Sequence, residues 1–328
     1  MALPESAVEY IAAQQARLRA LPKARIVFPE GDDPRVLEAA GRLASDGLLE
    51  PILIGKGSTP GVRFVDPAAS TLAGKYAALY YERRRAKGAT QVEAANAASH
   101  RLNFAALMVT AGDADAMVGS CVHTTADYVR AVLQCIDLKI GFRRLSSAHI
   151  LAVRPRQYGH KGLLAFSDAA ILAQPNAVEL AEIAIATAAT ARAVFNTEPL
   201  VAMLSFSTKS SATHPDVDKV VDALRYVRER APELQVDGEL QADAALDPSV
   251  GQTKSPGSPV AGYANTLIFP DLDAANMGYK LVERLGEGAL LAVLLQGNAR
   301  PASIISRGCT AEDAYNTAII TAVQAQAR

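Results

Sequence analysis

The chain has 328 residues, half of them hydrophobic, and its 33 lysines and arginines are balanced by 34 aspartates and glutamates, for a formal net charge of −1 at pH 7. This length suits about two domains of ordinary size, and the hydrophobic content is enough for a large core. The balanced charge, the absence of tryptophan and the few aromatic residues argue against a nucleic-acid-binding or membrane-surface protein.

The first half of the chain alternates helices with strands. Residues 1–21 have the pattern of an amphipathic helix that ends near Pro22, and they lack the apolar core of a signal peptide. Residues 24–31 (ARIVFPEG) predict a short buried strand, residues 33–47 a helix with a glycine stop, and residues 49–55 (LEPILIG) a second strand. Such a βαβ unit implies a parallel sheet with helices on its faces. Further helices are predicted at 73–88, 90–112 and 124–136.

The second half repeats this alternation and ends in a helix that begins near Thr310. The pattern is interrupted near residues 140–150, where we place the change from one domain to the next. The sequence therefore predicts an α/β fold. Strands are predicted at 145–153, 162–168, 199–208, 233–241, 265–271 and 289–297, and helices at 176–195, 216–231 and 276–286.

The three cysteines, Cys121, Cys135 and Cys309, show neither CxxC pairing nor metal-ligand spacing. We expect each to be a free, buried thiol, as in a protein of the reducing cytoplasm. The five histidines are scattered, so no metal site is predicted. No apolar run approaches the length of a membrane span.

Residues 52–58 (ILIGKGS) place a Gly-Lys-Gly-Ser turn after a strand, as a phosphate-binding loop does. That loop needs the GxxxxGK[ST] spacing and a helix directly after it, whereas Thr59, Pro60 and Gly61 follow here. No GxGxxG opens a helix either. Neither a nucleotide phosphate loop nor a dinucleotide fold is therefore predicted.

Small polar residues instead gather where predicted strands end, at 204–213, 252–262 and 269–276. Ligands of open α/β sheets bind at the carboxyl ends of strands. The stretch KSPGSPVAG combines Lys254 with Ser255 and Gly257, and a rigid loop with free backbone N–H groups and one cation suits a phosphate or pyrophosphate. A surface loop that needs tight turns explains the same residues equally well.

The stretch SRGCTAEDAYNTA, residues 306–318, opens the last helix. Thr310 and Asp313 have the spacing of a capping box, in which each side chain bonds the backbone of the other residue. A carboxylate at the start of a helix can also take part in a reaction. The pattern alone favours the cap and leaves the catalytic interpretation open.

Five long stretches resemble the phosphate acetyltransferase (phosphotransacetylase) family, part of the phosphate acetyl/butyryltransferase superfamily, and they occur in the order of that family. Residues 29–40 (PEGDDPRVLEAA) and 80–88 (YYERRRAKG) are similar more loosely. The five stretches are 112–134, 201–212, 236–246, 254–286 and 294–326.

The resemblance implies a reversible acyl transfer in which acetyl-CoA and phosphate give acetyl phosphate and CoA, with CoA as a substrate and neither cofactor nor metal required. It also implies a two-domain α/β fold like that of isocitrate and isopropylmalate dehydrogenases, with an interdomain cleft as the site. We expect one domain at 1–142 plus 294–328, to which the last helix returns, and the other at 143–293. The family further implies a cytoplasmic homodimer of acetate metabolism.

The resemblance also assigns roles to single residues. Asp313 falls on the aspartate that acts as the base, and Ser306 and Arg307 fall on the pair that binds and polarises the reacting acyl phosphate. An arginine suits that role because its planar fork grips a phosphate with two hydrogen bonds and stays charged. Arg84 and Arg130 match two arginines that hold substrate, and we assign them to the phosphates of CoA. Lys254, Ser255 and Gly257 complete the expected substrate-binding set.

Each arginine also has a simpler explanation. Arg307 could form a surface salt bridge, and Arg84, between Arg83 and Arg85, could belong to a solvated basic helix face. Arg130 stands among apolar residues, which makes an incidental surface charge a weaker explanation there.

Two other functions stay open at this point. One is a phosphate butyryltransferase-like enzyme with another acyl group. The other is a catalytically idle domain that senses CoA, although Ser306, Arg307 and Asp313 are all retained. A dehydrogenase of the same fold is disfavoured, since its acidic metal-binding cluster is not evident.

Overall fold

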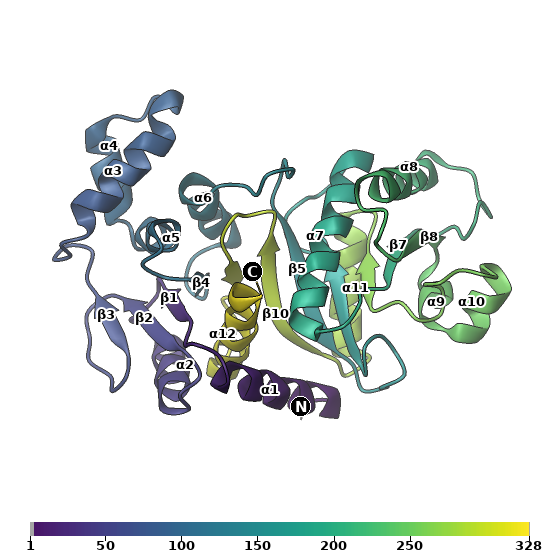
Figure 1. Ribbon diagram of the computed structural model, residues 1–328, viewed down its shortest axis with the longest axis horizontal. Helices are drawn as coiled ribbons and strands as arrows, with labels where there is room; N and C mark the ends of the chain where they lie inside the picture. Colours follow the sequence, from purple (N-terminus) through teal and green to yellow (C-terminus); the bar gives the residue numbers. More distant parts are fainter. Residues whose placement is uncertain (1–2, 328) are drawn as a thin grey trace. The chain divides into compact units, whose positions relative to one another are not determined.

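The computed structural model describes residues 3–327, which form two compact units (Figure 1). The first unit comprises residues 11–140 and 298–327, and the second comprises residues 3–10 and 141–297. Helix α1 (Glu5–Arg19) contributes residues to both.

The first unit is built around parallel strands in the order β3-β2-β1-β4-β11. Val27 of β1 is paired with Ile52 of β2 on one side and with Met117 of β4 on the other. The strands are β1 (Arg25–Phe28), β2 (Glu50–Ile54), β3 (Arg63–Val65), β4 (Ala116–Gly119) and β11 (Ala302–Ile304). The parallel βαβ arrangement expected from the sequence is confirmed in this unit.

The helices of the first unit are α2 (Pro34–Ser45), α3 (Ala73–Arg84), the 3₁₀ helix η1 (Arg85–Lys87), α4 (Gln91–Ser99), α5 (Arg101–Ala111), α6 (Thr125–Cys135) and α12 (Ala311–Gln326). Helix α2 buries Val36, Ala39, Ala40 and Leu43, a 3–4 spacing that places them on one face. Helix α12 packs against α2, β4 and β11, and its residues 314–323 are all buried. The last helix is therefore a core element of this unit.

The second unit has a mixed sheet in the order β10-β5-β6-β9-β7-β8. The β10–β5 and β5–β6 pairs are antiparallel, and the β6–β9, β9–β7 and β7–β8 pairs are parallel. The strands are β5 (Ser146–Ala152), β6 (Leu163–Ser167), β7 (Val201–Leu204), β8 (Val236–Leu240), β9 (Thr266–Ile268) and β10 (Ala289–Gln296).

Helices cover both faces of this second sheet, so its side chains divide between two cores (Figure 1). Along β7, Val201 and Met203 join the core under α7 and α8, whereas Ala202 and Leu204 join the core under α9 and α11. The helices are α7 (Ala177–Phe195), α8 (Pro215–Arg230), α9 (Ala242–Leu246), α10 (Pro248–Lys254) and α11 (Leu272–Arg284).

The predicted α/β class is confirmed, and the differences in detail are local. Strands β3, β4 and β11 have three or four residues each and were not predicted. The predicted helix at 90–112 is two helices, because His100 has extended backbone angles (φ −70°, ψ 131°) between α4 and α5. The three cysteines are free and buried, as predicted. Among residues 3–327, the helices are too short or too polar to cross a bilayer.

Candidate active site

Three loops of the first unit leave neighbouring parallel strands at the same edge of the sheet. They follow β1 (residues 29–33), β4 (residues 120–124) and β11 (residues 305–310). Parallel strands bring their carboxyl ends to one edge, which is where open α/β sheets bind ligands. Ser306, Arg307 and the cap of the helix that carries Asp313 all lie on the third loop.

Glu30, in the loop after β1, organises the loop after β4. Its side chain is buried, and its carboxylate accepts hydrogen bonds from the successive backbone N–H groups of residues 120–123 at 2.9–3.2 Å. His123 Nδ1 lies 2.8 Å from the same carboxylate. Burial by itself would raise the pKa of Glu30, but the hydrogen bonds from His123 and the backbone outweigh it and hold the pKa below its ordinary value. Glu30 is thus a charged anchor for the β4 loop.

Arg35 links all three loops. Asp33, the N-cap of α2, holds the guanidinium with two hydrogen bonds, of 2.9 Å to Nε and 2.8 Å to Nη2. Nη1 donates to the carbonyl oxygens of Arg307 (2.8 Å) and Cys309 (3.1 Å), and Nη2 donates to that of Cys121 (3.0 Å). The Asp33 carboxylate raises the pKa of Arg35 above its ordinary value, so the guanidinium stays charged.

The side chains of Ser306 and Arg307 are exposed. Within residues 3–327, Arg307 forms no ion pair; only its backbone carbonyl is bound, by Arg35. The surface salt bridge that was the simpler explanation of Arg307 is therefore absent among the described residues. Both side chains are free to meet a ligand at the edge of the sheet.

Asp313 forms the predicted capping box with Thr310. Asp313 Oδ2 accepts from Thr310 N–H at 2.8 Å and from Thr310 Oγ1 at 2.9 Å, and Thr310 Oγ1 accepts from Asp313 N–H at 3.1 Å. All of these carboxylate contacts use Oδ2. Oδ1 has no hydrogen-bond partner among the described residues, and the side chain is half-buried. The cap is thus real, and it occupies one carboxylate oxygen only.

Arg84 and Arg130 lie on α3 and α6, which pack against each other. Arg84 is half-buried and forms no ion pair within residues 3–327, unlike Arg83, which pairs with Asp137 at 2.7 Å. Arg130 is exposed and pairs with Asp127 at 2.7 Å, one turn earlier. The apolar neighbours of Arg130 in sequence therefore do not surround its guanidinium.

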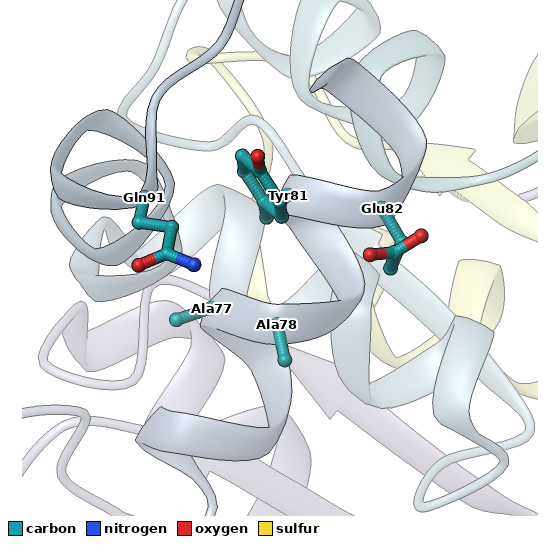
Figure 2. A pocket seen from close by; sticks show the side chains of 5 residues that line it. All are labelled: Ala77, Ala78, Tyr81, Glu82 and Gln91. Atoms are coloured by element: carbon teal, nitrogen blue, oxygen red, sulfur yellow. The ribbon is translucent and has the colours of Figure 1, made fainter. Parts of the chain in front are cut away.

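An open pocket of about 370 Å³ lies on α3 and the start of α4. Figure 2 shows its lining side chains, Ala77, Ala78, Tyr81, Glu82 and Gln91. The lining contains no basic residue, so this pocket lacks the charge that a phosphate group needs.

The remaining predicted residues belong to the second unit, and their surroundings differ from the expectation. Lys254 is the last residue of α10, and its ammonium group is paired with Asp243 at 2.7 Å. The N–H of Ser255 bonds the carbonyl of Gly251, so it is not free for an anion. Gly257 is exposed with φ +80°, a conformation that glycine adopts without strain.

A polar loop of the second unit follows β7, at one of the predicted strand ends. Ser207 and Glu239 are both buried, and Glu239 Oε1 accepts from Ser207 Oγ at 2.8 Å and from Ser210 N–H at 2.6 Å. Lys209 pairs with the buried Asp237 at 2.6 Å. The expectation that polar residues concentrate at strand ends holds for this loop, where they form hydrogen bonds and an ion pair with one another.

The sequence analysis did not single out Glu30 and Arg35. A usable signal existed, because the polar residues 30–33 (EGDD) lie at the end of a predicted buried strand. Besides Asp33, the partners of Arg35 are backbone carbonyls up to 274 residues away, and no side-chain pattern in the sequence marks a carbonyl.

Comparison with known proteins agrees with the resemblance. The profile described as phosphate acetyl/butaryl transferase matches residues 8–322. A phosphate acetyltransferase of Thermoanaerobacterium thermosaccharolyticum is 42% identical over 314 residues, covering 93% of this chain and 96% of the relative. A phosphate acetyltransferase of Bacillus subtilis is 43% identical over 313 residues, covering 92% and 94%.

Solved structures agree as well. A phosphotransacetylase from Streptococcus pyogenes has a TM-score of 0.90 and 39% identity, covering 97% of this chain and 98% of that one. A 4-hydroxythreonine-4-phosphate dehydrogenase from Klebsiella pneumoniae has a TM-score of 0.54 at 12% identity, covering 93% and 99%, and shares the fold alone. The dehydrogenase-like fold class expected from the sequence is confirmed. With its profile match and these relatives, the chain belongs to the phosphate acetyl/butaryl transferase family.

Proposed function

We propose that this protein is a phosphate acetyltransferase, which catalyses acetyl-CoA + phosphate = acetyl phosphate + CoA. The observation that carries the proposal is that the partly free carboxylate of Asp313 follows Ser306 and Arg307 at the start of α12. One oxygen of the carboxylate caps α12, the other has no partner within residues 3–327, and a hydroxyl and an unpaired guanidinium precede it on the same loop. The chain's relatives named as phosphate acetyltransferases support the same activity.

In the direction of acetyl-CoA formation, the CoA thiol gives its proton to Asp313 Oδ1. The thiolate attacks the carbonyl carbon of acetyl phosphate, so that a C–S bond forms while the C–O bond to phosphate breaks and phosphate leaves. Ser306 Oγ donates a hydrogen bond to the carbonyl oxygen as negative charge develops there. Arg307 binds the phosphoryl oxygens. In the opposite direction phosphate attacks the thioester, and the proton returns to the departing thiolate.

The nearby cysteines fit a direct transfer. Burial raises the pKa of the Cys121 thiol, and the negative charge of Glu30 adds to this effect. Burial also raises the pKa of the Cys309 thiol. Neither thiol is poised to form a thiolate at neutral pH, and the thiolate is the nucleophilic form. The nucleophile in this mechanism is therefore the thiol of CoA.

Arg84 and Arg130 bind the phosphate groups of CoA in this proposal. Within residues 3–327 Arg84 has no carboxylate partner to give up, and the exposed pair of Arg130 with Asp127 is of a kind that costs about 1 kcal/mol or less to break. Lys254, followed in the same loop by Ser255 and Gly257, supplies a further phosphate contact, for which its ammonium group exchanges its partner Asp243 for the ligand.

We also propose that the protein is a homodimer. Met277 and Leu281 lie on α11 and Leu285 is its C-cap, and more than half of each residue is exposed. A 4–4 spacing keeps these residues on one face of the helix. A stripe of exposed large apolar side chains is typical of a surface that is covered by another chain.

The test is a thiol-release assay with acetyl-CoA and phosphate, repeated with propionyl-CoA and butyryl-CoA. We expect release that depends on phosphate and is fastest with the acetyl thioester. Fastest release with butyryl-CoA would make the protein a phosphate butyryltransferase instead. No phosphate-dependent release with any thioester, together with CoA binding measured by calorimetry, would leave a CoA-sensing domain.

A further inference from the structure

The loop that carries Ser306 and Arg307 has few anchors. The N–H of Ile305 bonds the carbonyl of Gly119 at 2.8 Å, and the N–H of Cys309 bonds the carbonyl of Ser306 at 3.0 Å. Within residues 3–327, the side-chain hydrogen bonds to the backbone of residues 306–309 come from Arg35 alone. The direction of two exposed side chains therefore depends on one guanidinium.

Arg35 is built to hold that loop. The two hydrogen bonds that Arg35 donates to Asp33 fix the plane of the guanidinium, and three further N–H groups then point to carbonyl oxygens of Arg307, Cys309 and Cys121. A guanidinium can serve several acceptors at once because its donors form a rigid planar fork. Lysine has a single ammonium at the same position and cannot reproduce this set.

We infer that Arg35 is a positioning residue for the acetyl transfer, a role that rests on the proposed function. It acts through the carbonyl groups of Arg307 and Cys309 and does not touch the substrate. By fixing these carbonyls, it sets the direction in which the Ser306 hydroxyl and the Arg307 guanidinium leave the loop. Its bond to Cys121 ties the same loop to the one that Glu30 anchors.

Removal of this anchor has a defined kinetic consequence. A displacement of about 1 Å at reacting groups costs roughly a hundredfold in rate. We expect Arg35→Ala to lower kcat about a hundredfold and to change KM for CoA by less than about threefold, because the proposed CoA contacts lie on α3 and α6. Added guanidinium ion should restore part of the lost kcat, since it can refill the space beside Asp33.

Arg42 provides a matched control. It lies on the same helix α2, pairs with Glu312 at 2.8 Å and stacks over the Tyr315 ring at 4.3 Å, so it also links α2 to α12. Within residues 3–327 it forms no hydrogen bond or ion pair with residues 306–309. Arg42→Ala should keep kcat within about threefold of the wild type and should show no response to guanidinium.

Hydrogen exchange gives a readout that does not require activity. Amides of the peptide 305–313 should exchange faster in Arg35→Ala than in the wild type or in Arg42→Ala. If the wild type releases no thiol in the presence of phosphate, the proposed function fails while the exchange result still reports whether Arg35 holds the loop. Arg35→Lys repeats both measurements with the positive charge kept, in case the alanine variant does not fold.

The inference is supported by a selective loss of kcat, rescue by guanidinium and faster exchange of 305–313. It is overturned if Arg35→Ala keeps kcat within about threefold, if the exchange of this peptide is unchanged, or if Arg42→Ala loses as much activity.

Discussion

Asp313 and Thr310 share their hydrogen bonds unequally: the backbone N–H and the hydroxyl of Thr310 both donate to Oδ2 of Asp313, at 2.8 and 2.9 Å, and Oδ1 accepts from no residue in 3–327. A cap and a base are therefore compatible in one carboxylate. The capping interpretation and the catalytic interpretation can be separated by experiment, because they depend on different atoms.

Asp313→Asn removes the proposed base and keeps an oxygen that can cap the helix. General-base contributions are typically about a hundred- to ten-thousandfold, so kcat should fall at least about a hundredfold in a folded protein. Activity should recover partly as the pH rises towards about 8.5, the usual pKa of a thiol, because CoA then supplies thiolate unaided. A pH–rate profile and a thermal unfolding curve measure both effects. An active variant with an unchanged profile would remove Asp313 from the mechanism.

Thr310→Ala is the complementary change. It removes the hydroxyl that accepts from the N–H of Asp313, and loss of such a cap costs about 1 kcal/mol of stability. We expect a melting temperature lower by about 2–4 °C with kcat within about threefold of the wild type. A loss of kcat as large as that of Asp313→Asn would show that the capping contacts themselves matter for turnover.

Arg307→Gln should abolish most activity while the fold survives, since the guanidinium is exposed and unpaired within residues 3–327. Loss of one preorganised donor to a developing charge costs about 3–4 kcal/mol, or a hundred- to a thousandfold in kcat. Steady-state kinetics and circular dichroism together make the measurement. Arg300→Gln replaces another exposed arginine, two residues before β11, and is the control that should stay near the wild type. Near-normal turnover of Arg307→Gln would contradict the assignment.

Arg84→Ala and Arg130→Ala should each raise KM for CoA about tenfold, as expected for a lost charged hydrogen bond, and leave kcat largely intact. KM for acetyl phosphate should change less. Arg85→Ala removes an exposed arginine that pairs with Glu82 at 3.1 Å and serves as the control. Equal effects on both substrates would argue against CoA binding by these arginines.

Some elements of the first unit could be predicted from the sequence and others could not. The strand at 24–31 and the helix at 33–47 are predictable because buried β-branched residues, a cap and a 3–4 apolar spacing all occur within a few residues. The β4 and β11 strands are not, because three or four residues carry no periodicity and their pairing is decided by neighbours that are distant in the chain. The anchoring roles of Glu30 and Arg35 depend on the same distant pairing.

His149 makes stability depend on pH. It is buried in β5 with its ring 4.7 Å from that of Tyr279, and burial, with a smaller effect of the Lys280 charge, lowers its pKa from 6.5 to about 3. As the pH falls, His149 therefore binds a proton in the unfolded chain at a higher pH than in the folded protein. The contribution of the neutral His149 side chain to folding stability is fully present above pH 6.5 and is lost as the pH falls from there towards about 3.

Between pH 7.5 and 5.5 the wild type should lose about 1.4 kcal/mol of unfolding free energy through this group. His149→Phe, which keeps a ring against Tyr279 and cannot titrate, should lose correspondingly less. Denaturant unfolding at the two pH values measures the difference, and replacement of the exposed His100 by Gln is the control. Identical pH dependence in the wild type and in His149→Phe would exclude His149 as the cause.

The first unit is made of two segments of the chain, and its second segment, residues 298–327, completes the sheet. β11 lies beside β4, and α12 packs on α2, yet residues 141–297 are synthesised between these partners. At about 5–20 residues per second, the ribosome leaves the edge of β4 without its neighbour for on the order of ten seconds. An unpaired strand edge is a site for wrong association, so this interval is when a nascent chain most needs protection. Ser306, Arg307 and Asp313 lie in or directly before the elements that complete the first unit, so the proposed site cannot form until residues 298–327 have been synthesised.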